Sequence, residues 1–96
     1  MSGVPASSEV MVDNERVRAT IWRLPPNGGE TGWHRHELDY VITPVTGGAL
    51  TIENPGGDIA ESPLSPGASY FRSAGVEHNV MNKTGAEIVF VEVEMK

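Results

Sequence analysis

Three histidines have the residue type and spacing to bind a metal ion. His34, His36 and His78 are the only histidines among the 96 residues of the chain. Successive side chains of a β-strand point to opposite faces, so His34 and His36 would project from one face, about 6.5 to 7 Å apart along the backbone. A third ligand must come from another strand of a sheet that curls back on itself, so His78 predicts a barrel. A His-x-His pair is common on exposed strands, and the residues around it must support this interpretation.

The composition of the chain limits its chemistry and its partners. Zero cysteines exclude disulfides, thiolate ligands and a cysteine nucleophile, so a metal would have nitrogen and oxygen ligands. The net charge of -6 repels a phosphate backbone, and we expect no nucleic-acid partner. No apolar run approaches the roughly 20 residues that span a bilayer, and residues 1–10 lack the pattern of a signal peptide. We therefore expect a soluble, cytoplasmic protein without a membrane partner.

The elements that position the histidines are expected to be short β-strands. The 11 glycines and 7 prolines fall between short β-branched runs, which is typical of an all-β domain. We interpret residues 1–8 as a flexible polar arm and residues 9–96 as one domain. Strands are predicted within residues 10–24, as a pair around a turn at 13–14, and at 32–36, 38–45, 49–53, 69–72, 78–81 and 87–94, with a loop over 63–67. In the last strand Glu92 and Glu94 alternate with valines, which indicates one wet face carrying the glutamates and one buried face.

Two glycine-containing motifs surround the histidines. The stretch Gly28-x5-His34-x-His36, followed by Gly47, resembles the first motif of the cupins, and Gly67-x5-Ser73-x-Gly75-x2-His78-x3-Asn82 resembles the second, with serine in place of proline. The resemblance covers roughly residues 16–94 and implies a small single-domain cupin, a jelly-roll barrel of two antiparallel sheets. By this resemblance His34, His36 and His78 would be the ligands of one divalent transition metal, with iron, manganese, nickel and zinc as candidates.

The chain departs from the cupin pattern where the first motif carries glutamate, because Tyr40 stands there. A phenol with a pKa near 10 is a poor substitute for a carboxylate. Three alternatives are open: Asp39 turned inward by a β-bulge as a fourth ligand, Tyr40 as a ligand or as a donor outside the ligand shell, or three histidines with water in the remaining positions. We favour the last, with Tyr40 on the inner face and Asp39 on the outer face.

An open three-histidine site favours an enzyme that acts on a small molecule held in the barrel. The substrate would chelate the metal through two oxygens, or through oxygen and sulfur, while Tyr40 donates a hydrogen bond to a developing oxyanion. The resemblance to cupin dioxygenases favours dioxygenase-like chemistry, with isomerase or lyase chemistry also open. The alternatives are a binding module without turnover and a purely structural metal site. We also predict a homodimer, because Trp22 and an apolar stretch near residues 10–12 leave a strand edge to cover.

Overall fold

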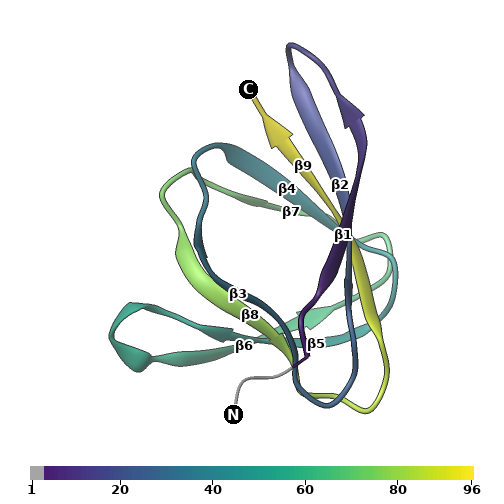
Figure 1. The fold of residues 1–96 in the computed structure, drawn as a ribbon, viewed down its shortest axis with the longest axis vertical. Helices are drawn as coiled ribbons and strands as arrows, with labels where there is room; N and C mark the ends of the chain where they lie inside the picture. Colours follow the sequence, from purple (N-terminus) through teal and green to yellow (C-terminus); the bar gives the residue numbers. More distant parts are fainter. Residues whose placement is uncertain (1–3) are drawn as a thin grey trace.

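The computed structural model describes residues 4–96, which form nine strands and one short 3-10 turn (Figure 1). The turn, η1 (Pro55–Gly57), lies between β5 and β6. No helix within residues 4–96 is long and apolar enough to cross a membrane. The strands in chain order are β1 (Ser7–Asp13), β2 (Val17–Leu24), β3 (Gly29–Arg35), β4 (Asp39–Pro44), β5 (Gly48–Glu53), β6 (Ile59–Leu64), β7 (Tyr70–Arg72), β8 (Glu77–Asn82) and β9 (Ile88–Met95).

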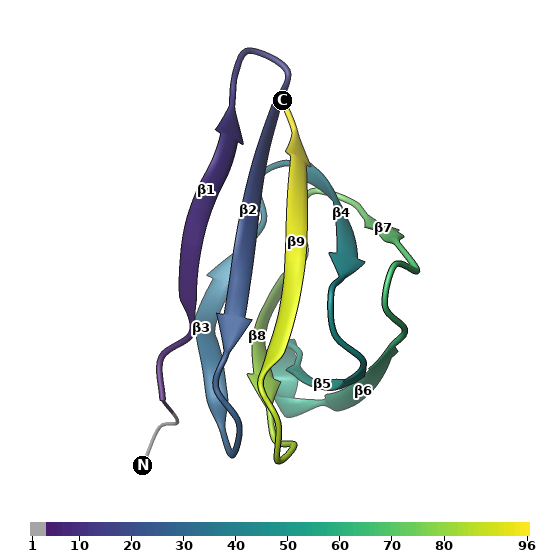
Figure 2. The same cartoon turned by 90° about the vertical axis from the view of Figure 1, so that its right-hand side faces the viewer.

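The strands form two antiparallel sheets that face each other. The larger sheet has the order β1-β2-β9-β4-β7, and the smaller sheet has the order β3-β8-β5-β6. Figure 2 shows the strands of the larger sheet in this order, with the smaller sheet behind them. All strand pairs in both sheets are antiparallel, as in a jelly roll. The all-β, two-sheet architecture predicted from the sequence is therefore confirmed.

β6 is a strand that the sequence did not predict. The prediction of a loop over residues 63–67 is wrong for residues 63 and 64, which belong to this strand. Pro63 and Leu64 belong to β6, where they pair with Ala49 and Gly48. β6 is the edge strand of the smaller sheet, and an edge strand tolerates a proline that lacks the backbone N–H. Leu64 is buried in the core and fixes the strand there, which the polar residues before it do not signal.

The N-terminal segment is more regular than the flexible arm expected at residues 1–8. β1 begins at Ser7, and Pro5 forms an isolated bridge with Glu30. The N–H of Ala6 donates to the carbonyl of Glu30 at 2.8 Å, and the N–H of Glu30 donates to the carbonyl of Val4 at 2.9 Å. These bonds tie the segment from residue 4 onward to the start of β3. Residues 1–3 lie outside the described part, and the flexibility of the arm stays a prediction.

The register of the larger sheet places the glutamates of β9 inside the barrel. β9 lies between β2 and β4, and Glu92 shares a face with Phe90 and Glu94. Glu92 is only 9% exposed, while Val91 and Val93 on the opposite face are half-buried. The prediction that the glutamates of β9 lie on a solvent-facing side is therefore wrong, because the smaller sheet covers that face of β9.

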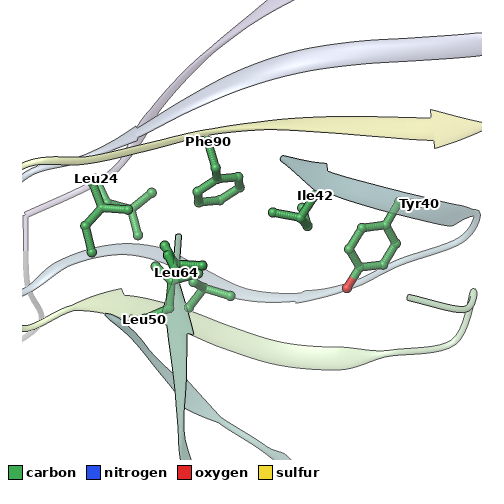
Figure 3. Close-up of a cluster of buried hydrophobic side chains, with 8 residues drawn as sticks. Leu24, Tyr40, Ile42, Leu50, Leu64 and Phe90 are labelled. Carbon is green, nitrogen blue, oxygen red and sulfur yellow. The ribbon is translucent and has the colours of Figure 1, made fainter. Parts of the chain in front are cut away.

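One end of the barrel is filled by apolar side chains. The buried cluster draws on both sheets and consists of Leu24, Tyr40, Ile42, Leu50, Leu64, Val80, Ile88 and Phe90. Figure 3 shows Leu24, Leu50 and Leu64 close together, with Ile42 and then Tyr40 leading away from them. Full burial of one such aliphatic side chain contributes roughly 1.5 to 3 kcal/mol. The cluster thus holds the two sheets together at the Leu24 end and leaves the other end for polar groups.

Asn82 joins three chain segments at the apolar end. It is the last residue of β8 and is 0% exposed. Its Nδ2 donates to the carbonyl oxygens of Leu24 and Ala86 at 3.0 and 2.8 Å. Its Oδ1 accepts from the backbone N–H and the hydroxyl of Thr84 at 3.0 and 2.7 Å. The amide therefore connects the end of β2 to the turn between β8 and β9.

The change Asn82→Ala should lower the free energy of unfolding by about 2 to 4 kcal/mol, because the buried carbonyl of Leu24 and the partly buried carbonyl of Ala86 lose a donor. Urea denaturation of the metal-free protein measures the loss. The control is Asn54→Ala, since the Asn54 side chain makes no capping hydrogen bond to the 3-10 turn, and it should cost less than about 0.5 kcal/mol. Equal losses in the two variants would contradict a structural role for the Asn82 amide.

Candidate metal centre

The three histidine side chains meet inside the barrel. His34 on β3 and His78 on β8 are register partners in the smaller sheet, and His36 follows the end of β3. The Nε2 atom of His36 lies 3.0 Å from Nε2 of His34 and 3.2 Å from Nε2 of His78. The ligand atoms of all three residues lie within 4.8 Å of one another. The structure thus brings together the three histidines that the sequence singled out.

Backbone hydrogen bonds hold His36 beside the turn that precedes β8. The N–H of His36 donates to the carbonyl of Val76 at 2.8 Å, and its carbonyl accepts from the N–H of Gly75 at 2.7 Å. Gly75 has a φ of 98°, a left-handed conformation in which a side chain would be strained. This glycine of the second motif therefore lets the turn lie against His36.

The outer ring nitrogens are arranged so that the inner ones can accept a metal ion. Nδ1 of His34 lies 2.9 Å from the carbonyl oxygen of Gly32, which can only accept, so Nδ1 carries the proton and Nε2 carries a lone pair. Nδ1 of His36 lies 3.8 Å from Oε2 of Glu92, which favours the same tautomer. Two metal–nitrogen bonds of about 2.1 Å at a right angle would place the nitrogens about 3.0 Å apart. The separations of His36 from His34 and from His78 therefore match those of neighbouring ligands on one metal ion.

Burial keeps two of the imidazoles neutral. It lowers the pKa of His36 and the pKa of His78 to about 4, and the nearby charge of His34 adds to both shifts. Imidazole binds metal ions in its neutral form. Both side chains are therefore in the ligand form at neutral pH.

Tyr40 lies inside the barrel, against the histidines. Its side chain is 2% exposed, and its ring stacks on the ring of His36 with centroids 3.9 Å apart and an interplanar angle of 18°. The Tyr40 hydroxyl is buried and has no hydrogen-bond partner in the described part of the chain. Burial, with a smaller effect from the charge of Glu92, raises the pKa of Tyr40 well above its usual value. Tyr40 is therefore a protonated donor beside His36.

Asp39 lies on the opposite side of β4 and does not enter the site. It is exposed, and its Oδ1 accepts the backbone N–H of Ala74 at 2.7 Å. β4 keeps a regular register with β9 here, since Asp39 pairs with Met95 and Tyr40 pairs with Glu94. The strand thus lacks the bulge that would turn the Asp39 carboxylate inward.

Glu92 is a carboxylate beside the histidines that the sequence analysis missed. Its Oε2 lies 3.8 Å from Nδ1 of His36. Burial raises the pKa of Glu92 to about 7, and the charge of Glu94 adds to the shift. The indole N–H of Trp22 lowers this pKa, although its geometry falls short of a full hydrogen bond. The signal that could have found Glu92 is its shared strand face with the apolar Phe90.

The histidines open onto a cavity of about 320 Å³. This volume lies within the range of small-molecule sites. Part of the wall is apolar, formed by residues such as Leu50, Val80 and Phe90. The charged lining residues are three arginines and three glutamates: Arg18, Arg35, Arg72, Glu37, Glu92 and Glu94. The cavity therefore combines an apolar wall with a charged region.

A two-sheet barrel with three inward-facing imidazoles defines a small single-domain cupin. The sequence matches the family described as "Cupin domain" over residues 20–94. The chain therefore belongs to the cupin family, and the resemblance found in the two motifs is confirmed.

Two similar proteins align with the chain over nearly their whole length. The chain is 55% identical over 97 residues to the "Beta-alanine degradation protein BauB" of Pseudomonas aeruginosa, with 100% of both chains covered. It is 53% identical to a cupin domain from Bordetella pertussis Tohama I, whose crystal structure has a TM-score of 0.94 and covers 100% of this chain and 98% of that one. The polyketide cyclase RemF from Streptomyces resistomycificus has a TM-score of 0.73 at 24% identity, covering 94% of this chain and 64% of that one. This last likeness concerns the fold alone.

The change Glu92→Gln should raise the Tm of the metal-free protein by roughly 2 to 8 °C near pH 8.5. The folded pKa of about 7 lies above the ordinary value of 4.5, so the folded state binds this proton more tightly than the unfolded state does. The resulting stabilisation is complete below the unfolded pKa and is lost as the pH rises through about 7. Glutamine removes the charge and with it this loss.

Thermal denaturation near pH 5 and near pH 8.5 tests this expectation. The control is Glu15→Gln on the exposed turn between β1 and β2, which should leave the Tm nearly unchanged at both pH values. A gain for Glu92→Gln of the same size at both pH values would show that the buried charge is not its cause.

Proposed function

We propose that this cupin is a metal-dependent enzyme that acts on a small chelating substrate. His34, His36 and His78 would hold one divalent transition metal, with iron, manganese, nickel and zinc as candidates. The observation that supports this best is the convergence of three Nε2 atoms on a cavity of about 320 Å³, with Nε2 of His36 lying 3.0 Å from that of His34 and 3.2 Å from that of His78. Three adjacent protein ligands leave further coordination positions for a substrate.

A bound metal ion would act as a Lewis acid and, for a redox metal, as an electron carrier in dioxygenase-like chemistry. The residues of the chain would supply the rest. The buried Tyr40 hydroxyl, which has no partner within the described residues, would donate a hydrogen bond to an oxygen on which negative charge develops. Glu92 would orient His36 through Nδ1, as carboxylates beside metal-bound histidines do. Isomerase or lyase chemistry stays open, and the alternative function is a module that binds a metal or a small molecule without turnover.

The similarity to BauB connects the proposal with a metabolic role. The name of that protein assigns it to β-alanine degradation, and 55% identity over the full length of both chains supports a related role for this one. We infer that the small substrate belongs to the breakdown of β-alanine or of a similar compound. The cytoplasmic location expected from the sequence stays a prediction.

Protein purified without chelator should contain about one divalent metal ion per chain by elemental analysis. His78→Ala should weaken metal binding by more than the roughly 10- to 100-fold that loss of an outer-shell partner costs. Asp39→Ala should change the affinity by less than about threefold, because an exposed carboxylate contributes little. Loss of the metal in Asp39→Ala would mean that Asp39 is a ligand and that the predicted site of three histidines with open coordination positions is wrong.

Oxygen uptake by the metal-loaded protein should rise with at least one member of a panel of diketones, thiols and uronates, with product analysis covering isomerase and lyase reactions. Tyr40→Phe should keep the metal and slow turnover by roughly tenfold to a thousandfold, because it removes the hydroxyl and keeps the ring that stacks on His36. A metal-loaded protein that binds these compounds and converts none of them would favour the binding module.

We also propose that a second copy of the chain covers β1. β1 is an edge strand of the larger sheet, and all seven of its residues are exposed (Figure 2). Val10, Met11 and Val12 are 54%, 48% and 46% exposed. Trp22, which the sequence analysis also assigned to this edge, packs against the core and lines the cavity instead. An edge strand with exposed apolar side chains favours pairing with another chain.

Light scattering at micromolar concentration should give twice the chain mass of 10.3 kDa. Val12→Lys should shift the protein toward the monomer, because a lysine on an edge strand opposes pairing. Val45→Lys is the matched control, since Val45 is 52% exposed and lies outside β1. A wild-type mass of one chain would refute the dimer.

A further inference from the structure

A row of polar side chains crosses the inner face of the larger sheet next to the histidines. Its members oppose one another in the register of β2, β9, β4 and β7 and all line the cavity: Arg18, Glu94, Tyr40 and Arg72, in this order. Opposed residues of neighbouring strands have Cβ atoms about 4.5 to 5.5 Å apart. The ring of Tyr40 stacks on His36, so these four residues, here called the polar row, run directly beside the histidines.

The two arginines of the polar row differ in their partners. Arg18 is neutralised by Glu94, to which its Nε and Nη2 donate at 2.8 and 3.1 Å. Arg72 makes no ion pair within residues 4–96, and its guanidinium lies 5.1 Å from the ring centroid of Tyr70. Burial raises the pKa of Tyr40, and the charge of Arg72 opposes this shift. The positive charge of Arg72 therefore acts at Tyr40, its register partner on β4.

Arg72, whose side chain is exposed, and the buried Tyr40 hydroxyl together offer donors for which residues 4–96 provide no acceptor. The Tyr40 hydroxyl has no hydrogen-bond partner among residues 4–96, and Figure 3 shows it directed across the interior toward the smaller sheet. A buried polar group without a partner is rare in folded proteins and calls for an acceptor. A guanidinium presents a planar fork of N–H groups that matches a carboxylate.

The charge of the cavity favours an anionic ligand. The three arginines and three glutamates of the lining balance formally, and the histidines are neutral ligands. A divalent ion would add two positive charges without a carboxylate ligand to compensate them, because Tyr40 occupies the position where the cupin motif carries glutamate. Fixed positive charge in a cavity raises the affinity for a negatively charged molecule.

We propose that the cavity selects a small carboxylate, whose carboxylate group is held by the Arg72 guanidinium and the Tyr40 hydroxyl while the rest of the molecule faces the three histidines. This inference rests on the proposed function, because the far end of the ligand would face the metal, whereas the contact at the carboxylate end needs only Arg72 and Tyr40. It assigns Arg72, which no cupin motif marks, as the residue that determines specificity. The role that the name of BauB suggests involves such a compound, since β-alanine carries a carboxylate at one end and an amine at the other.

Calorimetric titration of the metal-loaded protein with matched charged and uncharged probes tests the assignment. The probes are β-alanine with β-alaninamide, and β-hydroxypropanoate with β-hydroxypropanamide. The wild type should bind at least one carboxylate about tenfold or more tightly than its amide, which is the scale of a charge-assisted, bidentate contact. Arg72→Gln should abolish this preference, and Arg72→Lys should restore part of it. The control Arg16→Gln, an exposed arginine outside the cavity lining, should keep the preference.

A wild type that does not distinguish carboxylates from amides would overturn the inference, as would an Arg72→Gln variant that keeps the full preference. In either case, metal in the protein would leave the proposed function intact. If elemental analysis and dialysis show no metal binding, the proposed function fails, and the same titrations of the metal-free protein then decide the role of Arg72 by the same two criteria.

Discussion

The antiparallel register of β9 between β2 and β4 is the constraint on which the core and the candidate site both depend. One face of β9 carries Phe90, Glu92 and Glu94 in succession, so the same alternation places an apolar ring at one end of the barrel and carboxylates at the other. A slip of one residue would turn Val91 and Val93 inward and expose these groups. The register therefore separates a stabilising end from a chemical end within a single small barrel.

The two sheets contribute different parts of the site. The smaller sheet and the turn beside it supply the imidazoles, while the larger sheet supplies Tyr40, which stacks on His36 across the interior. Tyrosine replaces the glutamate of the cupin motif, yet a carboxylate still approaches the histidines, because Glu92 lies 3.8 Å from Nδ1 of His36. This carboxylate comes from β9 and lies on the Nδ1 side of the His36 ring, whereas Nε2 faces the other histidines. At 3.8 Å its charge acts on Nδ1 without a direct hydrogen bond, and it leaves the inner nitrogens facing the cavity.

Several buried polar groups in the cavity lower the stability of the folded chain. The Tyr40 hydroxyl and the Trp22 indole N–H are buried and find no hydrogen-bond partner from residue 4 to residue 96, and burial raises the pKa of Glu92 to about 7. Each unpaired buried group costs on the order of 1 to 3 kcal/mol. The saturated amide of Asn82, at the other end of the barrel, shows that the chain can satisfy a buried polar group completely. The unsatisfied groups are concentrated where a ligand would meet them, as is typical of functional sites.

The fold class and the three histidines could be predicted from the sequence, because glycine and proline punctuation, strand alternation and the spacing of two motifs are local features. The sequence also separated Tyr40 from Asp39 by counting along one strand. It could not find β6, which depends on the burial of Leu64 against the other sheet, or the inward face of β9, which depends on cover from the smaller sheet. The position of Glu92 beside His36 and the pairing of Arg72 with Tyr40 follow from the three-dimensional fold, since strand order and register bring together residues far apart in the chain.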